Sequence, residues 1–180
     1  MIKKWELLDS TIEMQGRVFT VRSERSVSPR TEKVGSFHVI DSAPWVNVIA
    51  ITARSDVVLI RQYRHGNHQV SLEIPGGLVE EADPAEAAVR ELLEETGFTG
   101  DPPELLGSVS PNPALFSNRC YMYLIENVRN TGLVRLDENE DIEVELVPLS
   151  RIPALIRDGS IDHALVIAAF HFYLAGREST

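Results

Sequence analysis

Apolar and polar positions over residues 84–96 recur with the period of an amphipathic helix. One side of this predicted helix carries four apolar residues, namely Ala85, Val89, Leu92 and Leu93. The other side carries three acidic residues, Glu91, Glu94 and Glu95. We therefore expect the apolar side to pack against a core and the acidic side to face something other than the core.

Both ends of the predicted helix carry residues that usually begin and end one. Asp83 is a favourable N-cap, and Pro84 suits the first helical position, where its missing N–H group removes no hydrogen bond. Gly97 suits the C-terminal cap because glycine adopts the left-handed backbone conformation without strain. Two glycines, Gly76 and Gly77, precede the helix in a loop that allows the backbone to approach a ligand closely.

The rest of the chain alternates between strand patterns and two further helical patterns. Residues 45–53 and 56–64 have the apolar content of buried strands joined by a tight turn. Further strands are predicted at residues 104–110, 119–125 and 142–147, and helices at residues 150–158 and 161–175. Three extended segments are predicted near the N-terminus, at residues 5–8, 17–27 and 34–40. These elements indicate an α/β fold with a mixed sheet between helices and an added N-terminal antiparallel sheet.

Length and composition indicate one soluble domain. The chain has 180 residues, of which 43% are hydrophobic, and this is enough apolar material for a proper core. Its net charge of −10 argues against binding nucleic acid through phosphate neutralisation. The single cysteine, Cys120, excludes an internal disulfide and suits a reducing cytoplasm. We expect no signal peptide in residues 1–10 and no membrane span, because the longest apolar window, residues 164–174, is too short.

The acidic side of the helix at residues 84–96 is the first candidate for chemistry. Glu91 and Glu95 are like charges one helical turn apart, and neither has a Lys or Arg four residues away. Crowded carboxylates suit Mg²⁺, which takes oxygen ligands and completes its shell with water and phosphate. The alternative is an acidic face exposed to solvent. The glycine loop favours the metal, since the carbonyl of Gly76 is a further oxygen ligand.

The order of residues in this region resembles the signature box of the Nudix hydrolases. The similarity rests on Gly76, followed by Arg90-Glu91-Leu92, Glu94-Glu95 and Gly97-Phe98. Proteins of this family cleave a nucleoside diphosphate linked to another moiety. The resemblance implies the Nudix fold, an α/β/α sandwich with a mixed sheet.

The chain departs from the family pattern in the first half of the box. The loop is one residue shorter than usual, and Ala82 stands where the family has a glutamate. In the family that glutamate mainly pairs with the box arginine. We therefore expect Glu86 or Glu94 to pair with Arg90 instead.

The resemblance implies a set of metal ligands. Glu91 and Glu95, with Glu94 and the Gly76 carbonyl, would hold Mg²⁺, or Mn²⁺, which prefers similar ligands. Glu73 precedes the glycines in a strand and is a candidate for supporting or occasionally binding the metals. The number of metal ions stays open.

The chain resembles the branch of the family that contains ADP-ribose and nucleoside-diphosphate-sugar pyrophosphatases, which implies contacts to substrate. Arg64 would contact the diphosphate or terminal ribose, because a guanidinium matches phosphate oxygens, and Arg61 is a weaker candidate. Pro113 lies where this branch has a proline downstream of the box, although its loop can also simply connect two strands. Trp45 is a candidate for stacking on the base, with a core position as the alternative.

An acidic loop at residues 137–141 is the candidate source of a general base. Hydrolysis of a diphosphate requires a water molecule to lose its proton near phosphorus. By resemblance, Glu138 matches the catalytic glutamate, and Glu140 matches a second acid that can reach a metal. Taken alone, the loop is a solvated turn.

The resemblance also implies an organisation and a reaction. Residues 1–43 would form a strand segment that packs against or swaps with a second subunit in a homodimer, and residues 44–180 would form the Nudix hydrolase domain. The expected reaction is Mg²⁺-dependent hydrolysis of ADP-ribose or a nucleoside diphosphate sugar to a nucleoside monophosphate and a sugar phosphate. The alternatives are a Nudix enzyme for dinucleoside polyphosphates or oxidised nucleotides, and a non-catalytic nucleotide-sugar sensor. The identity of the sugar and base stays open.

Overall fold

A computed structural model describes residues 1–136, 138 and 140–177. The chain divides into two compact units. The smaller unit consists of Met1–Ala43 and Ser110–Arg119, and the larger unit consists of Pro44–Val109 and Cys120–Thr180. A segment from the middle of the chain therefore belongs to the N-terminal unit.

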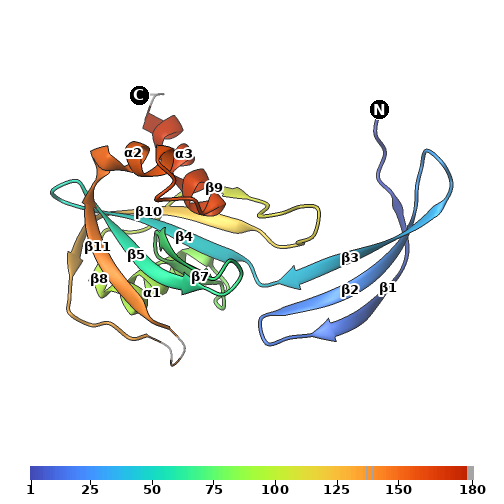
Figure 1. The fold of residues 1–180 in the computed structure, drawn as a ribbon, viewed down its shortest axis with the longest axis horizontal. Helices are drawn as coiled ribbons and strands as arrows, with labels where there is room; N and C mark the ends of the chain where they lie inside the picture. The colour runs from blue at the N-terminus through green and yellow to red at the C-terminus, as the bar shows by residue number, and fades with distance from the viewer. Residues whose placement is uncertain (137, 139, 178–180) are drawn as a thin grey trace. The chain divides into compact units, whose positions relative to one another are not determined.

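The smaller unit is built on a three-stranded antiparallel sheet. Its strands are β1 (Glu6–Gln15), β2 (Phe19–Val27) and β3 (Val34–Ser42), paired in that order (Figure 1). The segment at residues 110–119 is hydrogen-bonded to β3, because the Ile40 N–H donates to the Leu115 carbonyl at 2.7 Å and the Ser117 N–H donates to the Ile40 carbonyl at 3.1 Å. The Asp41 carboxylate adds contacts with Arg22 and the Ser117 hydroxyl.

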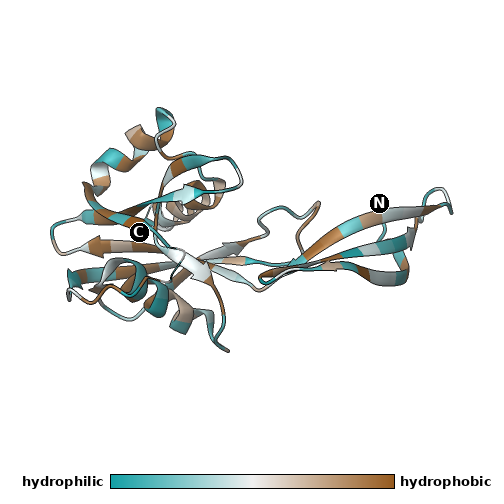
Figure 2. Cartoon of the chain, turned by 60° about the horizontal axis from the view of Figure 1, so that its bottom comes forward, coloured by the Kyte–Doolittle hydropathy of each residue, from teal (hydrophilic) through white to brown (hydrophobic). Residues whose placement is uncertain are grey.

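Strand β1 exposes apolar side chains. All ten of its residues are exposed, and they include Leu7, Ile12 and Met14. Hydrophobic segments are visible along the N-terminal strands in Figure 2. Exposed apolar side chains on an edge strand are typical of a surface that pairs with another chain.

The larger unit is organised around an eight-stranded mixed sheet. Its central strands run in the order β11-β5-β4-β10-β8, with β6 beside β5, β7 beside β4 and β9 beside β10. Strands β4 and β10 are parallel, and the other pairs are antiparallel. The strand bounds are β4 Trp45–Thr52, β5 Asp56–Arg64, β6 Gln69–Glu73, β7 Gly76–Leu78, β8 Phe98–Thr99, β9 Glu104–Val109, β10 Cys120–Asn130 and β11 Ile142–Pro148.

Helices cover both faces of this sheet (Figure 1). Helix α1 (Pro84–Thr96) lies on one face, and the short η1 (Leu149–Arg151), α2 (Ile152–Arg157) and α3 (Ala164–Arg177) lie on the other. Neighbouring residues of a strand point to opposite faces, so β4 supplies both cores. Its Val48 packs in the cluster under α1, and its Ile49 packs in the cluster under α2 and α3. The predicted α/β/α arrangement with a mixed sheet is confirmed.

Helix α1 begins and ends where the sequence predicts. The Asp83 carboxylate accepts a hydrogen bond from the Ala85 N–H at 2.9 Å, and Pro84 occupies the first turn. Gly97 has a φ of 72°, and its N–H donates to the Leu93 carbonyl at 2.8 Å. A residue with a Cβ atom would be strained at this position.

The predicted buried side of α1 is only partly right: Leu92 is buried and Ala85 packs on the core, but the face is rotated from the predicted one. Val89 is 38% exposed, whereas two of the glutamates expected to face outward, Glu91 and Glu95, are only 9% and 4% exposed. The helix packs through its small residues, because Ala87 and Ala88 let it approach the sheet closely. A prediction from hydrophobic periodicity depends mainly on the large apolar side chains, so it places the centre of the buried side too close to Val89. The two glutamates lie in the middle of the helix face that is buried.

No helix among the described residues is both long enough and apolar enough to cross a bilayer.

The buried side of α1 leads to a prediction about stability. Leu92→Ala should lower the free energy of unfolding by about 2–5 kcal/mol, because it leaves a cavity beneath the helix. Val89→Ala, on the exposed side, should change it by less than about 0.5 kcal/mol. Urea unfolding followed by circular dichroism measures both values. Equal losses for the two variants would contradict the observed orientation of the helix.

Candidate active site

Two buried carboxylates lie against the glycines of β7. The Gly76 N–H donates a hydrogen bond to Glu95 Oε2 at 3.0 Å. A Cβ atom at Gly77 would collide with the carboxylate of Glu91, and a Cβ atom at Gly76 would collide with the Val46 carbonyl. Glycine is therefore required at Gly76, where the collision is with backbone, whereas a side chain at Gly77 would displace the Glu91 carboxylate.

Burial dominates the electrostatics of these two carboxylates. It raises the pKa of Glu95 to about 8, which the Gly76 N–H partly offsets, and it raises the pKa of Glu91 to about 7, which Arg90 partly offsets. The negative charge of Glu140 raises both pKa values further. The ionised forms of Glu91 and Glu95 are thus poorly stabilised by the protein alone.

Arg90 donates hydrogen bonds to several groups on the outer side of helix α1. Its guanidinium donates to Glu81 Oε1 at 2.5 Å, to Glu94 Oε2 at 3.0 Å and to the Leu78 carbonyl at 3.0 Å. The expected pairing with Glu94 is present, and Glu81 is a partner that sequence reasoning missed. Arg90 also donates to Glu91 Oε1 at 3.0 Å, so Glu91 has a cation beside it although no Lys or Arg lies four residues away. The spacing rule considered residues four apart and overlooked the adjacent arginine, whose long side chain reaches both Glu91 and Glu94.

Arg64 and Glu73 form a two-bonded ion pair. Arg64 Nε and Nη2 donate to the two Glu73 oxygens at 2.8 and 2.7 Å. Glu73 is 2% exposed, so burial alone would raise the pKa of its carboxyl group, but Arg64 outweighs burial and the pKa is lowered. Arg64 therefore keeps Glu73 ionised at the end of β6, beside the glycine loop.

The remaining predicted substrate residues lie in different surroundings. Arg61 pairs with Glu145 of β11 at 2.8 Å, and both side chains are partly exposed. Trp45 is partly buried and packs on the core beneath α2 and α3. Pro113 belongs to the smaller unit, in the segment hydrogen-bonded to β3.

One residue of the acidic loop at residues 137–141, Glu140, acts electrostatically on Glu91 and Glu95. Glu140 is exposed and close enough to raise the pKa values of Glu91 and Glu95. Glu138 is exposed in a turn and forms no ion pair within the described part of the chain. Its neighbours at positions 137 and 139 lie outside the described residues.

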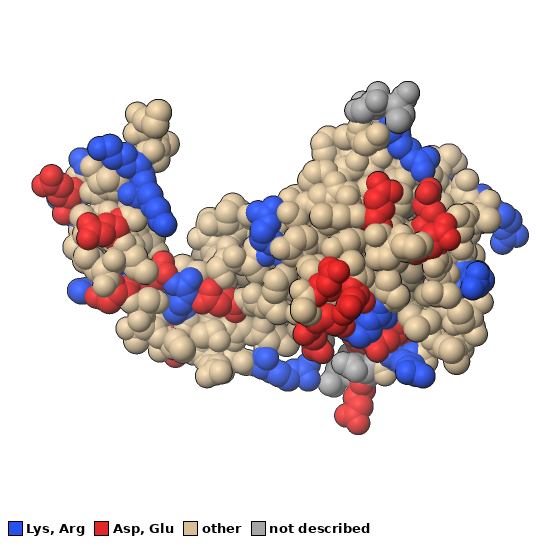
Figure 3. All heavy atoms as spheres, turned by 180° about the vertical axis from the view of Figure 1, so that it is seen from behind, with Lys and Arg blue, Asp and Glu red and all other residues tan. Residues whose placement is uncertain are grey.

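The carboxylates of Glu91 and Glu95 suit a cation that takes few of its ligands from the protein. Among residues 1–136, 138 and 140–177, no three Asp, Glu, His or Cys side chains converge as a ready-made metal centre. Mg²⁺ usually binds one or two carboxylates and completes its shell with water and substrate phosphates. Glu91 and Glu95 supply two such carboxylates with raised pKa values, and a cation would favour their ionised form. Figure 3 shows that acidic side chains gather on one face of the larger unit, with basic side chains among them.

A buried asparagine beside the glycine loop was also missed. Asn47 is 9% exposed, and its Nδ2 atom has no hydrogen-bond partner among the described residues. Its Oδ1 atom lies next to Gly76, within the space that a Cβ atom there would need. The signal was available in the sequence, since Asn47 interrupts an apolar strand and a buried amide requires partners.

Comparisons with known proteins extend over most of the chain. The "Methanol dehydrogenase activator" of Bacillus methanolicus is 32% identical over 132 residues, covering 72% of this chain and 71% of that protein. The "ADP-ribose pyrophosphatase" of Bacillus subtilis (strain 168) is 28% identical over 129 residues, covering 71% and 70%. The solved structure described as "Crystal structure of ADP compounds hydrolase" has the same fold, with a TM-score of 0.87, 23% identity and coverage of 99% of this chain and 97% of that one.

A family model, the NUDIX domain, matches residues 42–170. This match spans the mixed sheet, the glycine loop and helix α1 with its buried carboxylates. The protein therefore belongs to the NUDIX domain family.

Proposed function

We propose that the protein hydrolyses the pyrophosphate bond of ADP-ribose or a nucleoside diphosphate sugar, giving a nucleoside monophosphate and a sugar phosphate. The observation that carries the proposal is the pair of buried glutamates held against the Gly76-Gly77 backbone in a chain of the NUDIX family. The name of the Bacillus subtilis relative supports ADP-ribose as a substrate.

Glu91 and Glu95 are the proposed ligands of Mg²⁺ or Mn²⁺, with Glu94 and the Gly76 carbonyl as further ligands. When bound, the cation supplies Lewis-acid polarisation of the diphosphate. Helix α1 and the glycine loop hold the two glutamates in place before substrate arrives, because their carboxylates pack against β7. Arg90 fixes Glu94 on the outer side of the same helix. Glu73, buried and paired with Arg64, is the proposed support for these ligands.

Arg64 is the proposed clamp on the substrate diphosphate. Glu73 engages its Nε and Nη2 groups, which fixes the plane of the guanidinium and leaves the Nη1 group to donate to phosphate oxygen. Its side chain is 43% exposed and so remains accessible. Arg61, paired with Glu145, is the second candidate, and Trp45 and Pro113 are proposed contacts to the nucleotide.

Glu138 is the proposed general base, and Glu140 a second acid beside the buried pair. Glu138 would take a proton from water as the water oxygen bonds to phosphorus and the bridging P–O bond breaks. The leaving phosphate keeps the electrons of that bond. The effect of Glu140 on the pKa values of Glu91 and Glu95 supports a position for this loop near the site.

We also propose that the active protein is a cytoplasmic homodimer joined through residues 1–43. The exposed apolar side chains of β1 support this assembly, because they leave an edge strand open to a second copy. The larger unit, residues 44–180, would carry the hydrolase site.

A substrate panel combined with one variant tests the function. Phosphate released after phosphatase treatment should appear with ADP-ribose, ADP-glucose, GDP-mannose or UDP-glucose in the presence of Mg²⁺. Glu95→Gln should lower turnover on the best substrate by about a hundredfold or more, because it removes the charge while preserving volume. Glu86→Gln, on the exposed side of the same helix, is the matched control and should retain full activity. A Glu95→Gln enzyme with near wild-type turnover would show that the metal assignment is wrong.

The raised pKa values predict how stability depends on pH in chelator. The native state holds protons on Glu91 and Glu95 up to about pH 7 and 8, whereas the unfolded chain releases them near the ordinary value of 4.5. The contribution of these groups to the free energy of unfolding is therefore fully present below pH 4.5 and is lost as pH rises through 7 to 8. The melting temperature in EDTA should fall between pH 4.5 and pH 8, and it should fall less steeply for Glu95→Gln. An equal slope for both proteins would contradict the assigned burial of Glu95.

The proposed dimer predicts the effect of a charge on β1. The native protein should elute with twice the 20.1 kDa mass of one chain in size-exclusion chromatography with light scattering. Ile12→Glu should shift it toward the monomer, because it places a charge on an exposed apolar position, whereas Thr11→Glu on the same strand should have a smaller effect. A native protein that is monomeric at micromolar concentration would refute the dimer.

A further inference from the structure

The register of β7 on β4 places Gly76 opposite Asn47. The Val48 N–H, one residue further along β4, donates to the carbonyl of Pro75, one residue before Gly76, at 2.8 Å. This pattern makes Asn47 and Gly76 a non-hydrogen-bonded pair, in which the two Cα atoms approach to about 4.5 Å and the peptide groups of each residue point away from the other strand. The Gly76 N–H accordingly donates to Glu95 and not to β4. Hydrogen bonds from β4 therefore do not restrain the N–H and carbonyl groups of Gly76.

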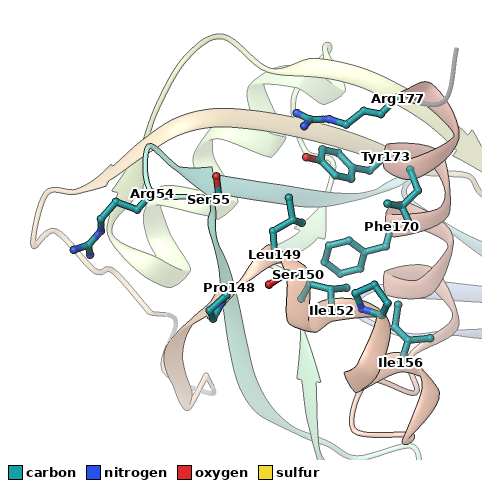
Figure 4. A pocket seen from close by; sticks show the side chains of 12 residues that line it. Arg54, Ser55, Pro148, Leu149, Ser150, Ile152, Ile156, Phe170, Tyr173 and Arg177 are labelled. Carbon is teal, nitrogen blue, oxygen red and sulfur yellow. The ribbon is translucent and has the colours of Figure 1, made fainter. Parts of the chain in front are cut away.

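The Asn47 side chain lies on the opposite side of the sheet from α1. Val48 packs in the cluster under α1, and Ile49 packs in the cluster under α2 and α3, so residue 47 points the same way as Ile49. A pocket of about 540 Å³ opens on this side beside α2 and α3, and Asn47 is not among the residues that line it (Figure 4). A ligand in that pocket would therefore not contact the Asn47 amide.

The two glycines of β7 are held between side chains from two different elements. On one face, the Asn47 Oδ1 atom is 2.7 Å from the place that a Cβ atom of Gly76 would take. On the other face, the Glu91 carboxylate occupies the place of a Cβ atom at Gly77. Glycine does not limit its own φ and ψ angles, so contacts of this kind determine the backbone conformation. Glu91 is a proposed cation ligand, whereas Asn47 belongs to a central strand and contacts the glycine from behind.

Hydrogen bonding within the described residues does not explain an asparagine at this place. Its side chain is 9% exposed, and no group in that part of the chain accepts a hydrogen bond from Nδ2. A buried amide is unfavourable in an otherwise apolar strand, where a β-branched residue such as valine would suit the sheet. Asparagine differs from valine in reaching one atom further, and that atom is the one that lies against Gly76.

We propose that Asn47 is a positioning residue for the glycine loop. It holds the Gly76 backbone so that its N–H group meets Glu95 and its carbonyl group stays turned away from β4, available as a ligand. This inference rests on the proposed function, in which Glu95 and the Gly76 carbonyl bind the cation. Asn47 itself acts only through Gly76. A residue that supports a site from a rigid strand can be unfavourable for folding and still be retained.

Hydrogen exchange of the Gly76 amide, followed by NMR in EDTA, tests this role without metal or substrate. Asn47→Val removes the atom that contacts Gly76, so the Gly76 N–H should exchange about tenfold faster. The matched control is Ile49→Val, a buried position on the same strand and the same side, which should leave this exchange rate unchanged. Asn47→Val should melt no lower than the native protein, whereas Ile49→Val should melt lower because it removes a buried methyl group.

Steady-state kinetics with ADP-ribose supply the second measurement. Asn47→Val should lower kcat by about tenfold and raise the Mg²⁺ concentration that gives the half-maximal rate, while KM for ADP-ribose at saturating Mg²⁺ stays within about twofold. Ile49→Val should keep the native values.

Three results would overturn the role of Asn47: an unchanged exchange rate for Gly76 in Asn47→Val, a native kcat in that variant, or a melting temperature below that of the native protein. The last result would show that the amide serves the fold. A native protein that hydrolyses none of the substrates would instead refute the proposed function, and the exchange and melting measurements would then decide the role of Asn47 by themselves.

Discussion

The burial of two carboxylates against a glycine backbone is the interaction on which the larger unit depends. Glu91 and Glu95 occupy the middle of the face through which α1 packs, and they fit there because β7 presents no side chains at Gly76 and Gly77. The small residues Ala87 and Ala88 complete the close approach of helix and sheet. Burying an acid is normally unfavourable, so this arrangement sacrifices stability to hold charge at a fixed place.

The acids around this contact fall into two electrostatic groups. Glu81 and Glu94 are neutralised by Arg90, and Glu73 is neutralised by Arg64. Glu95 has a backbone N–H as its hydrogen-bond partner and no ion pair within the described part of the chain. The arginines therefore fix the surrounding acids in place, whereas Glu95 is buried with only a backbone N–H as its hydrogen-bond partner among the described residues. Proteins commonly concentrate such perturbed carboxylates where they do chemistry.

Local signals in the sequence identified the elements but not how the helix is rotated. Asp83, Pro84 and Gly97 defined the ends of α1 because capping depends on a few adjacent residues. The buried side was misjudged because it depends on which part of the sheet the helix meets, and alanines and paired acids carry little weight in a periodicity. The ion pairs of Arg90 with Glu81 and of Arg64 with Glu73 each join residues nine positions apart in different elements, so no helical spacing rule reveals them. The box residues predict a site on α1 and its preceding loop, where the structure brings Glu91 and Glu95 against Gly76 and Gly77. The loop at residues 137–141 could be assigned only by resemblance.

The segment at residues 110–119 has a consequence for how the polypeptide acquires its shape during synthesis. Three N-terminal strands can pair as soon as they emerge, since each follows its neighbour through a short turn. The bridge between Ile40 and Phe116, however, waits until seventy-six further residues have been made. During that interval the ribosome-bound chain presents the edge of β3 without its final partner. An unpaired strand edge can pair with other chains, so the speed of translation and chaperone binding over this interval affect how much of the chain associates wrongly.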